Sequence, residues 1–178
     1  KSLGLTPIPI NISTKSKIFR SKIPFHLDFE DRQRDYLKFL KDNNISNIVL
    51  LATEGDSLCC CGLSIKEFYL EHNFGVWDFS VKDFTSPPLE KMQKDVDVVY
   101  NELKNNTLLG NVLVHCVAGQ GRTGAFLLCL AAKHFKGTPD EFPSLKEALS
   151  WIRQPHLIPP AVESRQQKQL VQEYMNAI

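Results

Sequence analysis

The chain has 178 residues, of which 43% are hydrophobic and 23% charged, and its formal net charge at neutral pH is +1. This composition excludes a disordered chain, and the balanced charge shows no basic excess that would favour nucleic acid as a partner. We expect a single domain over 1–178, with an irregular lead-in over 1–16 that is rich in Ser, Thr, Pro and Asn.

Short apolar runs alternate with amphipathic segments along the first half of the chain. They predict strands over 17–20, 45–52 and 74–79, helices over 29–43 and 64–72, and a loop over 53–62. Ser64 is expected to cap the second of these helices, because Glu67 follows three residues later as in a capping box.

The second half continues the alternation. It predicts a loop over 81–88, a helix over 89–105, a strand over 111–115, a glycine-rich turn over 116–121 and helices over 122–135, 144–153 and 161–176. Since strands alternate with helices throughout, we expect an α/β fold with a central, mostly parallel sheet flanked by helices.

Five cysteines, three of them consecutive at Cys59, Cys60 and Cys61, make a poor disulfide framework and lack the spacing of a zinc site. A reducing compartment, cytoplasmic or nuclear, is the simplest expectation. The triplet is interpreted as a buried or loop cluster; the alternative is a resolving thiol for Cys116 under oxidation.

No apolar run is long enough to span a bilayer, and the N-terminal segment lacks the apolar core of a signal peptide. The first residue is not Met, so a removed targeting segment stays open as an alternative.

Chemistry concentrates in the stretch HCVAGQGRTG over 115–124, between a predicted buried strand and a predicted helix. Open α/β sheets place their ligands at the carboxyl ends of strands. Gly119 and Gly121 allow a turn whose backbone N–H groups face inward as an anion nest, and the following helix adds its positive end. Such surroundings favour the thiolate of Cys116 as a nucleophile.

Arg122 closes this turn, and its planar guanidinium can hold two phosphate oxygens at once. The nest and the guanidinium can stabilise a transferring phosphoryl group. Thr123 lies where a hydroxyl could donate to the cysteine sulfur and ease its departure.

The stretch resembles the H-C-x5-R-[ST]-G signature of the protein tyrosine phosphatase superfamily, and most of all its short dual-specificity branch, including the kinase-associated and cell-division-cycle phosphatases. The resemblance implies a phosphatase-like fold and hydrolysis of phosphotyrosine, phosphoserine and phosphothreonine proteins through a phosphocysteine, without metal or cofactor. It implies that substrate phosphate contacts Val117, Ala118, Gly119, Gln120, Gly121 and Arg122.

A leaving oxygen needs a proton from a positioned acid, which this superfamily carries on an upstream loop. Asp83 and Asp78 compete for this role. Asp83 begins a D-x-x-x-P arrangement of the dual-specificity kind, whereas Trp77-Asp78 lacks the proline of the W-P-D loop. We therefore predict Asp83 as the general acid, the alternative being a solvated loop carboxylate or Asx turn.

Three further residues receive supporting assignments. By resemblance, His115 is expected to hydrogen-bond the loop backbone, and Gln167 to face the site from the last helix; an exposed helix glutamine is the alternative for Gln167. Glu54 follows a predicted strand and is a weaker candidate to pair with Arg122.

The loop interior has no lysine, and the chain has no Asn-Arg-Tyr motif. These absences favour a shallow cleft for phosphoproteins over a site for phosphoinositides. The alternatives are a phosphatase of phosphoinositides, other small molecules or RNA 5′ ends, a phosphoprotein-binding pseudophosphatase and a rhodanese-like sulfur carrier. We expect a monomer whose partner is a phosphorylated protein substrate, with no nucleic acid bound and no transmembrane segment.

Overall fold

A five-stranded sheet forms the centre of the computed structural model, which describes residues 3–178. The strands, in the spatial order β1-β2-β5-β3-β4, are β1 (Thr6–Ile8), β2 (Ile18–Ser21), β5 (Asn111–His115), β3 (Ile45–Leu50) and β4 (Gly75–Asp78). Only β1 and β2 pair antiparallel; the other three pairs are parallel. The predicted α/β fold with a mostly parallel sheet is therefore confirmed.

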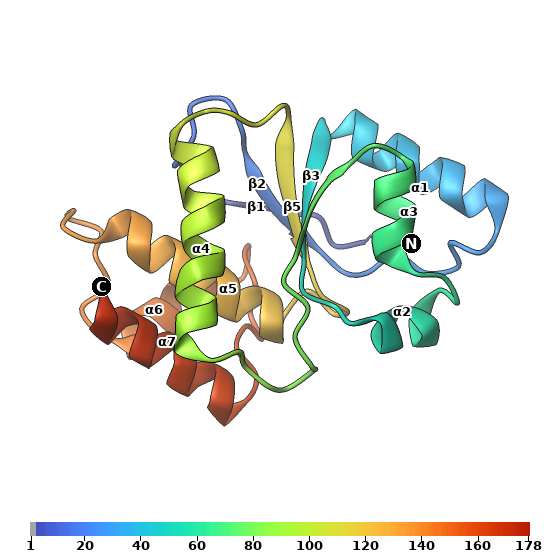
Figure 1. Ribbon diagram of the computed structural model, residues 1–178. Coiled ribbons are helices and arrows are strands. Elements are labelled where there is room, and N and C mark those ends of the chain that lie inside the picture. Colours follow the sequence, from blue (N-terminus) through green and yellow to red (C-terminus); the bar gives the residue numbers. More distant parts are fainter. Residues whose placement is uncertain (1–2) are drawn as a thin grey trace.

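Helices cover both faces of the sheet (Figure 1). The helices on one face are α1 (Glu30–Asp42), α2 (Glu54–Cys60) and α3 (Ile65–Glu71), and those on the other are α4 (Leu89–Lys104), α5 (Gly121–Phe135), α6 (Leu145–Ile152) and α7 (Arg165–Ala177). Successive side chains of β3 point to opposite faces, so Ile48 joins the hydrophobic cluster under α1 and α3 while Val49 joins the cluster under α4 to α7. Burial on both sides explains the apolar runs over residues 48–50 of β3 and 112–114 of β5.

The fold gathers four strand ends at one edge of the sheet. Strands β2, β5, β3 and β4 are parallel, so their carboxyl ends meet there. At this edge β5 ends at His115, and α5 begins at Gly121 after a short loop. The side chains of α5 are buried on every side as far as Ala132, which holds the start of this helix firmly in place.

The predicted irregular lead-in is wrong over residues 6–8, which form β1, while residues 1–2 lie outside the described residues. Strand β1 pairs with β2 in the register Ile8 with Ile18, and the side chain of Ile8 is buried. Pro7 suggested a loop, but an edge strand tolerates a residue that cannot donate a backbone hydrogen bond.

Two further predictions need correction. The predicted loop over 53–62 contains α2, whose start is stabilised by a capping box between Thr53 and Asp56 despite the glycine in its first turn. The last helix begins at Arg165 instead of residue 161, because Ser164 and Gln167 form a second capping box that sets the N-terminus of α7.

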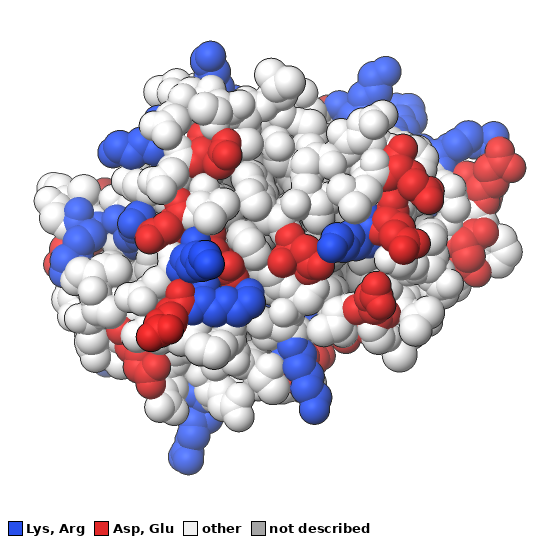
Figure 2. Space-filling model, in the orientation of Figure 1, with Lys and Arg blue, Asp and Glu red and all other residues white. Residues whose placement is uncertain are grey.

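Acidic and basic side chains are interspersed over the face shown in Figure 2, in keeping with the net charge of +1. Within residues 3–178, no helix combines the length and the apolar character needed to cross a membrane.

Candidate active site

The loop of residues 116–121, the signature loop, turns sharply between β5 and α5. Gly119 has φ = +72°, a left-handed conformation that favours glycine. A Cβ atom at this position would also collide with the carbonyl oxygen of Ser21 at the end of β2. The backbone N–H of Ile23 donates to Val117 O at 2.7 Å, so the segment after β2 holds the loop from one side.

Cys116 lies at the start of the signature loop with only 3% of its surface exposed. The Thr123 hydroxyl, from the first turn of α5, donates to Cys116 Sγ at 3.2 Å. A hydroxyl donor stabilises negative charge on sulfur. The structure therefore brings together Cys116, the nucleophile predicted from the sequence, and Thr123, the predicted hydrogen-bond donor to its sulfur.

Arg122 is almost completely buried, with 2% of its side chain exposed. Its Nη1 donates to Asp56 Oδ2 at 2.7 Å and to Val81 O at 2.8 Å. Its Nε and Nη2 have no hydrogen-bond partner within residues 3–178. Buried guanidinium donors are rarely left unpaired, so these two N–H groups are available to a bound anion.

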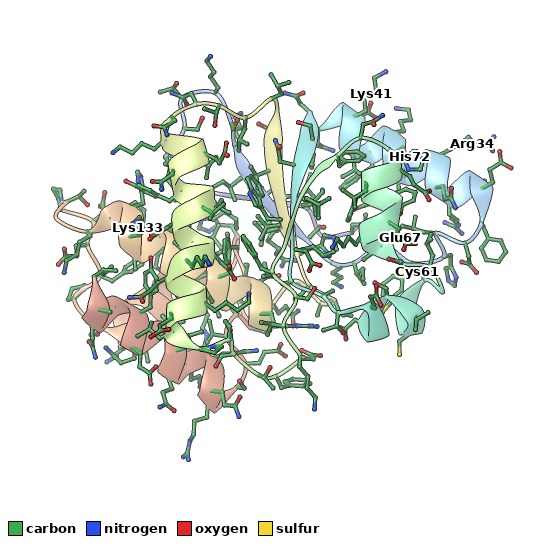
Figure 3. All side chains as sticks on the ribbon, viewed as in Figure 1. Arg34, Lys41, Cys61, Glu67, His72 and Lys133 are labelled. Atoms are coloured by element: carbon green, nitrogen blue, oxygen red, sulfur yellow. The ribbon has the colours of Figure 1, made fainter. Side chains whose placement is uncertain are left out.

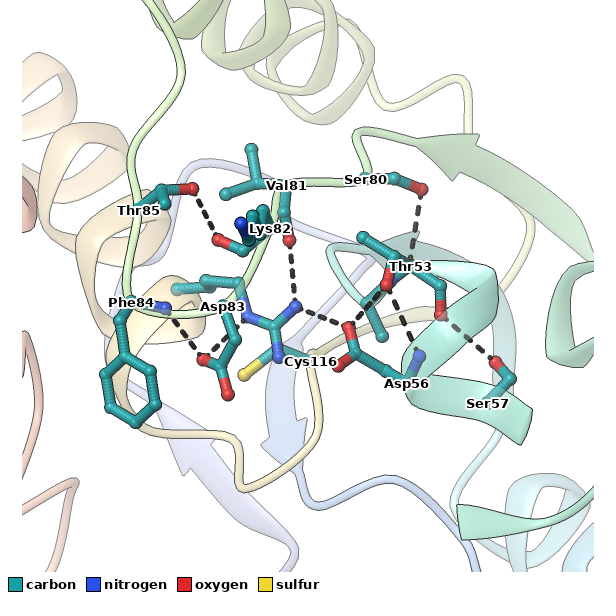
Figure 4. Close-up of polar contacts among 12 residues, drawn as sticks. Thr53, Asp56, Ser57, Ser80, Val81, Lys82, Asp83, Phe84, Thr85 and Cys116 are labelled. Atoms are coloured by element: carbon teal, nitrogen blue, oxygen red, sulfur yellow. Dashed lines mark hydrogen bonds and ion pairs between the residues drawn. The ribbon is translucent and has the colours of Figure 1, made fainter. Parts of the chain in front are cut away.

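Asp83 is the loop carboxylate that the structure places beside Arg122. Its Oδ1 lies 3.4 Å from Arg122 Nε and accepts from the Phe84 N–H at 2.9 Å. In Figure 4 the Cys116 sulfur lies between the carboxylates of Asp83 and Asp56. Phe84 has φ = +59°, a strained conformation for a non-glycine residue. The segment that places Asp83 beside Arg122 therefore has an uncommon backbone conformation.

Asp78 makes its polar contacts with residues outside this cluster. Its carboxylate pairs with Lys66 at 3.1 Å and accepts from the Ser80 hydroxyl and N–H. Partial burial raises the pKa of Asp78, but the hydrogen bonds from Ser80 and Lys66 outweigh it and hold the pKa below its usual value. The Asp78 carboxylate is thus occupied by its contacts with Lys66 and Ser80 at the end of β4.

Asp56 is a site residue that sequence reasoning missed. Partial burial raises the pKa of this carboxyl, but the hydrogen bonds from Arg122 and Thr53 hold it below the ordinary value. Asp56, and not the predicted Glu54, is the residue of α2 that pairs with Arg122. The capping pattern of Thr53 and Asp56 was the available signal, although it indicated only a helix start.

His115 anchors the signature loop from below. Its Nδ1 is 2.9 Å from Cys116 O, a group that can only accept, so Nδ1 carries the proton. The Tyr69 hydroxyl then donates to Nε2 at 2.7 Å, and the Tyr36 hydroxyl donates to Tyr69 at 2.6 Å. Burial raises the pKa of both tyrosines, which keeps them protonated. Neither tyrosine was predicted, because they come from α1 and α3, far away in sequence.

We expect this network to make stability depend on pH. Burial lowers the pKa of His115 to about 4, the bond to Cys116 O opposes this, and the charge of Arg122 adds to the lowering. The unfolded chain, with an ordinary histidine, binds more protons between these values. The contribution of neutral His115 to the free energy of unfolding is therefore fully present above pH 6.5 and is lost as the pH falls toward 4. The free energy of unfolding should fall by roughly 2 kcal/mol between pH 7 and pH 5.

Urea unfolding at a series of pH values measures this effect. The exposed His156 provides the control: His156→Asn should keep the dependence, whereas His115→Asn should flatten it between pH 7 and pH 5. An equal slope in the two variants would show that His115 is not its source.

Gln167 is fully buried, so the exposed alternative is wrong. Its Oε1 accepts from the N–H groups of Glu163 and Ser164 at 2.8 and 3.1 Å. Its Nε2 has no partner within the described residues and lies 3.1 Å from where a Cβ of Gly121 would be. Gln167 therefore packs against the end of the signature loop.

The cysteine triplet is unbonded: Cys59 is exposed, Cys60 half-buried and Cys61 buried. In Figure 3 Cys61 lies near α2 and α3, across the sheet from Lys133 of α5. Burial raises the pKa of Cys60 and Cys61, so their thiols are poor nucleophiles at neutral pH. Residues 3–178 contain no cluster of three or more His, Cys, Asp or Glu side chains that could hold a metal ion.

A cysteine at a strand-to-helix loop, an arginine six residues later and an aspartate from the preceding crossover define a protein of the dual-specificity phosphatase class within the protein tyrosine phosphatase superfamily. The chain belongs to the family described as "Polymorphic toxin system, DSP-PTPase phosphatase", whose sequence model matches residues 29–136.

Curated relatives agree with this assignment. Dual specificity protein phosphatase CDC14C of Symphalangus syndactylus is 26% identical over 118 residues, which cover 66% of this chain and 20% of that protein. CDC14B of Mus musculus is 25% identical over the same length, with the same coverage. The chain thus spans about a fifth of the length of these relatives.

Solved structures share the fold over nearly the whole chain. Kinase associated phosphatase, with its catalytic site cysteine replaced by serine, has a TM-score of 0.78 at 16% identity, covering 99% of this chain and 96% of that one. A mutant form of Tk-PTP has a TM-score of 0.69 at 21% identity, covering 97% and 95%. These similarities show that the fold is that of a phosphatase.

Proposed function

We propose that the chain hydrolyses phosphomonoesters of phosphotyrosine, phosphoserine and phosphothreonine proteins through a phosphocysteine intermediate at Cys116. One observation carries the proposal: Arg122 has two buried N–H groups, on Nε and Nη2, without hydrogen-bond partners among the described residues. A guanidinium edge of this kind can donate hydrogen bonds to two oxygens of one phosphate. Nη1 is already fixed by Asp56 and Val81, so the edge formed by Nε and Nη2 is oriented in advance.

The first chemical step forms a bond between Cys116 Sγ and phosphorus and breaks the phosphoester bond. Protonated Asp83 gives its proton to the leaving oxygen, so a neutral alcohol departs. The signature-loop N–H groups and Arg122 stabilise the charge on the three equatorial oxygens. Because Asp83 lies beside Arg122, acid and clamp reach the same phosphoryl group.

The second step returns the enzyme to its starting state. Asp83, now ionised, takes a proton from water as the water oxygen attacks phosphorus. The sulfur–phosphorus bond breaks, and the Thr123 hydroxyl, 3.2 Å from Cys116 Sγ, stabilises the departing thiolate. Inorganic phosphate is released. Neither step requires a metal ion, so we expect full activity in the presence of a chelator.

The substrate assignment rests on the loop itself. Val117, Ala118 and Gln120 line it without a lysine, so the loop offers no second cation for the extra phosphates of an inositol headgroup. Kinase associated phosphatase, which shares this fold, has a catalytic site cysteine, and this supports the corresponding role for Cys116.

A substrate panel tests this proposal. Phosphotyrosine, phosphoserine and phosphothreonine peptides would be compared with soluble phosphatidylinositol phosphates, in reductant and chelator. We expect turnover of the peptides at higher kcat/KM than of the lipids. A preference for the lipids would overturn the phosphoprotein assignment but not the phosphocysteine chemistry. Binding of all substrates without turnover would favour a pseudophosphatase.

The role of Asp83 is tested by a matched pair of variants from one segment, Asp83→Asn and Asp78→Asn. Asp83→Asn should lower kcat on a phosphotyrosine peptide by about 10² to 10³-fold, the usual loss for a general acid. The loss on para-nitrophenyl phosphate should be much smaller, because its leaving group needs little protonation. Asp78→Asn should stay near wild type on both substrates; a larger loss in this variant would show that the acid was assigned to the wrong aspartate.

A further inference from the structure

Arg20, in β2, is a buried cation without a counter-ion. Its exposed fraction is 8%. Its Nε and Nη1 have no hydrogen-bond partner, and no carboxylate lies within ion-pair distance, among residues 3–178. Burying an unpaired charge is strongly unfavourable. A buried arginine without a carboxylate partner indicates that its charge interacts with another negative group, such as a thiolate or a bound anion.

The guanidinium of Arg20 lies against the signature loop. Strand β2 runs parallel to β5, with Arg20 opposite Val114. Nη1 of Arg20 is 3.3 Å from where a Cβ of Gly119 would be, and Ser21 O packs under the same glycine. Arg20 therefore approaches the loop from the β2 side, while Arg122 approaches from α5.

The charges around the site are unevenly matched. Asp56 pairs with Arg122 at 2.7 Å, so the Asp56 carboxylate alone already offsets the positive charge of Arg122. A thiolate and a phosphate dianion then add negative charge beyond what Arg122 balances. Burial lowers the pKa of Arg20, while the charge of a Cys116 thiolate raises it. This attraction is mutual, so Arg20 also favours negative charge at the loop.

We propose that Arg20 is a positioning residue of the phosphate site, whose unpaired charge behind the signature loop stabilises the Cys116 thiolate and the bound phosphate dianion. The inference rests on the proposed function. Because Arg20 acts through the loop and does not touch the phosphate, a lysine at this position should replace much of its effect and a neutral side chain should not.

The test compares Arg20→Met, Arg20→Gln and Arg20→Lys with Arg34→Met. Arg34 lies on the outer side of α1 (Figure 3) and is exposed, so its removal changes the net charge equally. Alkylation of Cys116 by anionic iodoacetate and by neutral iodoacetamide would be followed by peptide mass spectrometry, which separates Cys116 from exposed Cys59. Binding of inorganic phosphate would be measured by calorimetry.

Arg20→Met and Arg20→Gln should slow the reaction with iodoacetate by about tenfold and weaken phosphate binding by a similar factor. The ratio of the iodoacetate rate to the iodoacetamide rate should fall in both variants. Arg20→Lys should recover most of the loss, and Arg34→Met should match wild type. Since the removed charge is buried and unpaired, the neutral variants should unfold at no lower temperature than wild type.

Equal behaviour of Arg20→Met and Arg34→Met, or failure of Arg20→Lys to restore phosphate binding, would overturn the proposal. A neutral variant that melts at a lower temperature but alkylates normally would show that Arg20 only supports the fold. Alkylation and phosphate binding need no turnover, so they report on Arg20 even if the chain fails to hydrolyse any phosphoester.

Discussion

Cys116→Ser is expected to abolish hydrolysis of phosphotyrosine peptide, with kcat/KM lowered by at least about 10⁴-fold. A serine hydroxyl remains protonated where a thiol ionises, so the signature loop would surround a poor nucleophile. The loop and Arg122 would remain in place, so the variant should still bind the phosphopeptide. Steady-state kinetics and calorimetric binding, carried out side by side, measure the two effects.

Cys129 offers a matched control within the same structure. It is completely buried in α5, away from the signature loop, and burial raises its thiol pKa far above the usual value. Cys129→Ser tests for general damage by a cysteine-to-serine change and should keep its kcat in the folded protein. Retention of wild-type activity by Cys116→Ser would contradict the assigned nucleophile.

Arg122→Lys should lower kcat/KM by about 10² to 10³-fold, the cost of losing a preorganised donor at a developing charge. Lysine keeps the positive charge beside Asp56, but it has no planar edge to hold two oxygens. Phosphate and phosphopeptide binding should weaken together with kcat, because the guanidinium edge formed by Nε and Nη2 serves both ground state and transition state.

Arg34→Lys, on the exposed surface of α1, is the control for this substitution and should behave as wild type. Circular dichroism melting of both variants separates loss of the clamp from loss of the fold. Normal catalysis by a folded Arg122→Lys variant would show that charge alone suffices and that the two unpaired N–H groups have no special role.

Local sequence patterns predicted which residues lie together at the signature loop, but not the distant residues that contact them. Cys116, Arg122 and Thr123 lie within eight residues of one another, so one turn and one helix start determine their arrangement. The strand before them and the helix after them were predicted within one residue at each end. The α/β sheet followed from alternating apolar periodicity.

The supporting contacts depend on residues distant in the chain. Asp56 pairs with Arg122 across 66 residues, and Tyr69 reaches His115 across 46. The sequence around Asp56, in a predicted loop, and around Tyr69, on a predicted helix, contains no pattern that indicates these distant partners. Arg20 likewise looked like the end of a short strand, and only packing against Gly119 reveals its position.

Domain extent, oligomeric state and cellular location are properties that the fold and the site do not determine. The chain spans about a fifth of its curated relatives, so the single domain over 1–178, the monomeric state and the cytoplasmic or nuclear location stay predictions. The redox alternative for Cys59 to Cys61 also stays a prediction.

If the phosphoryl group passes through Cys116, rapid quenching within one turnover should trap it there. The protein would be mixed with excess phosphotyrosine peptide, quenched in acid within one turnover and digested for mass spectrometry. We expect one phosphoryl group on the peptide that contains Cys116, present in wild type and absent in Cys116→Ser. Continued turnover with Cys116 unmodified at every time point, or a phosphoryl group on another residue, would contradict it.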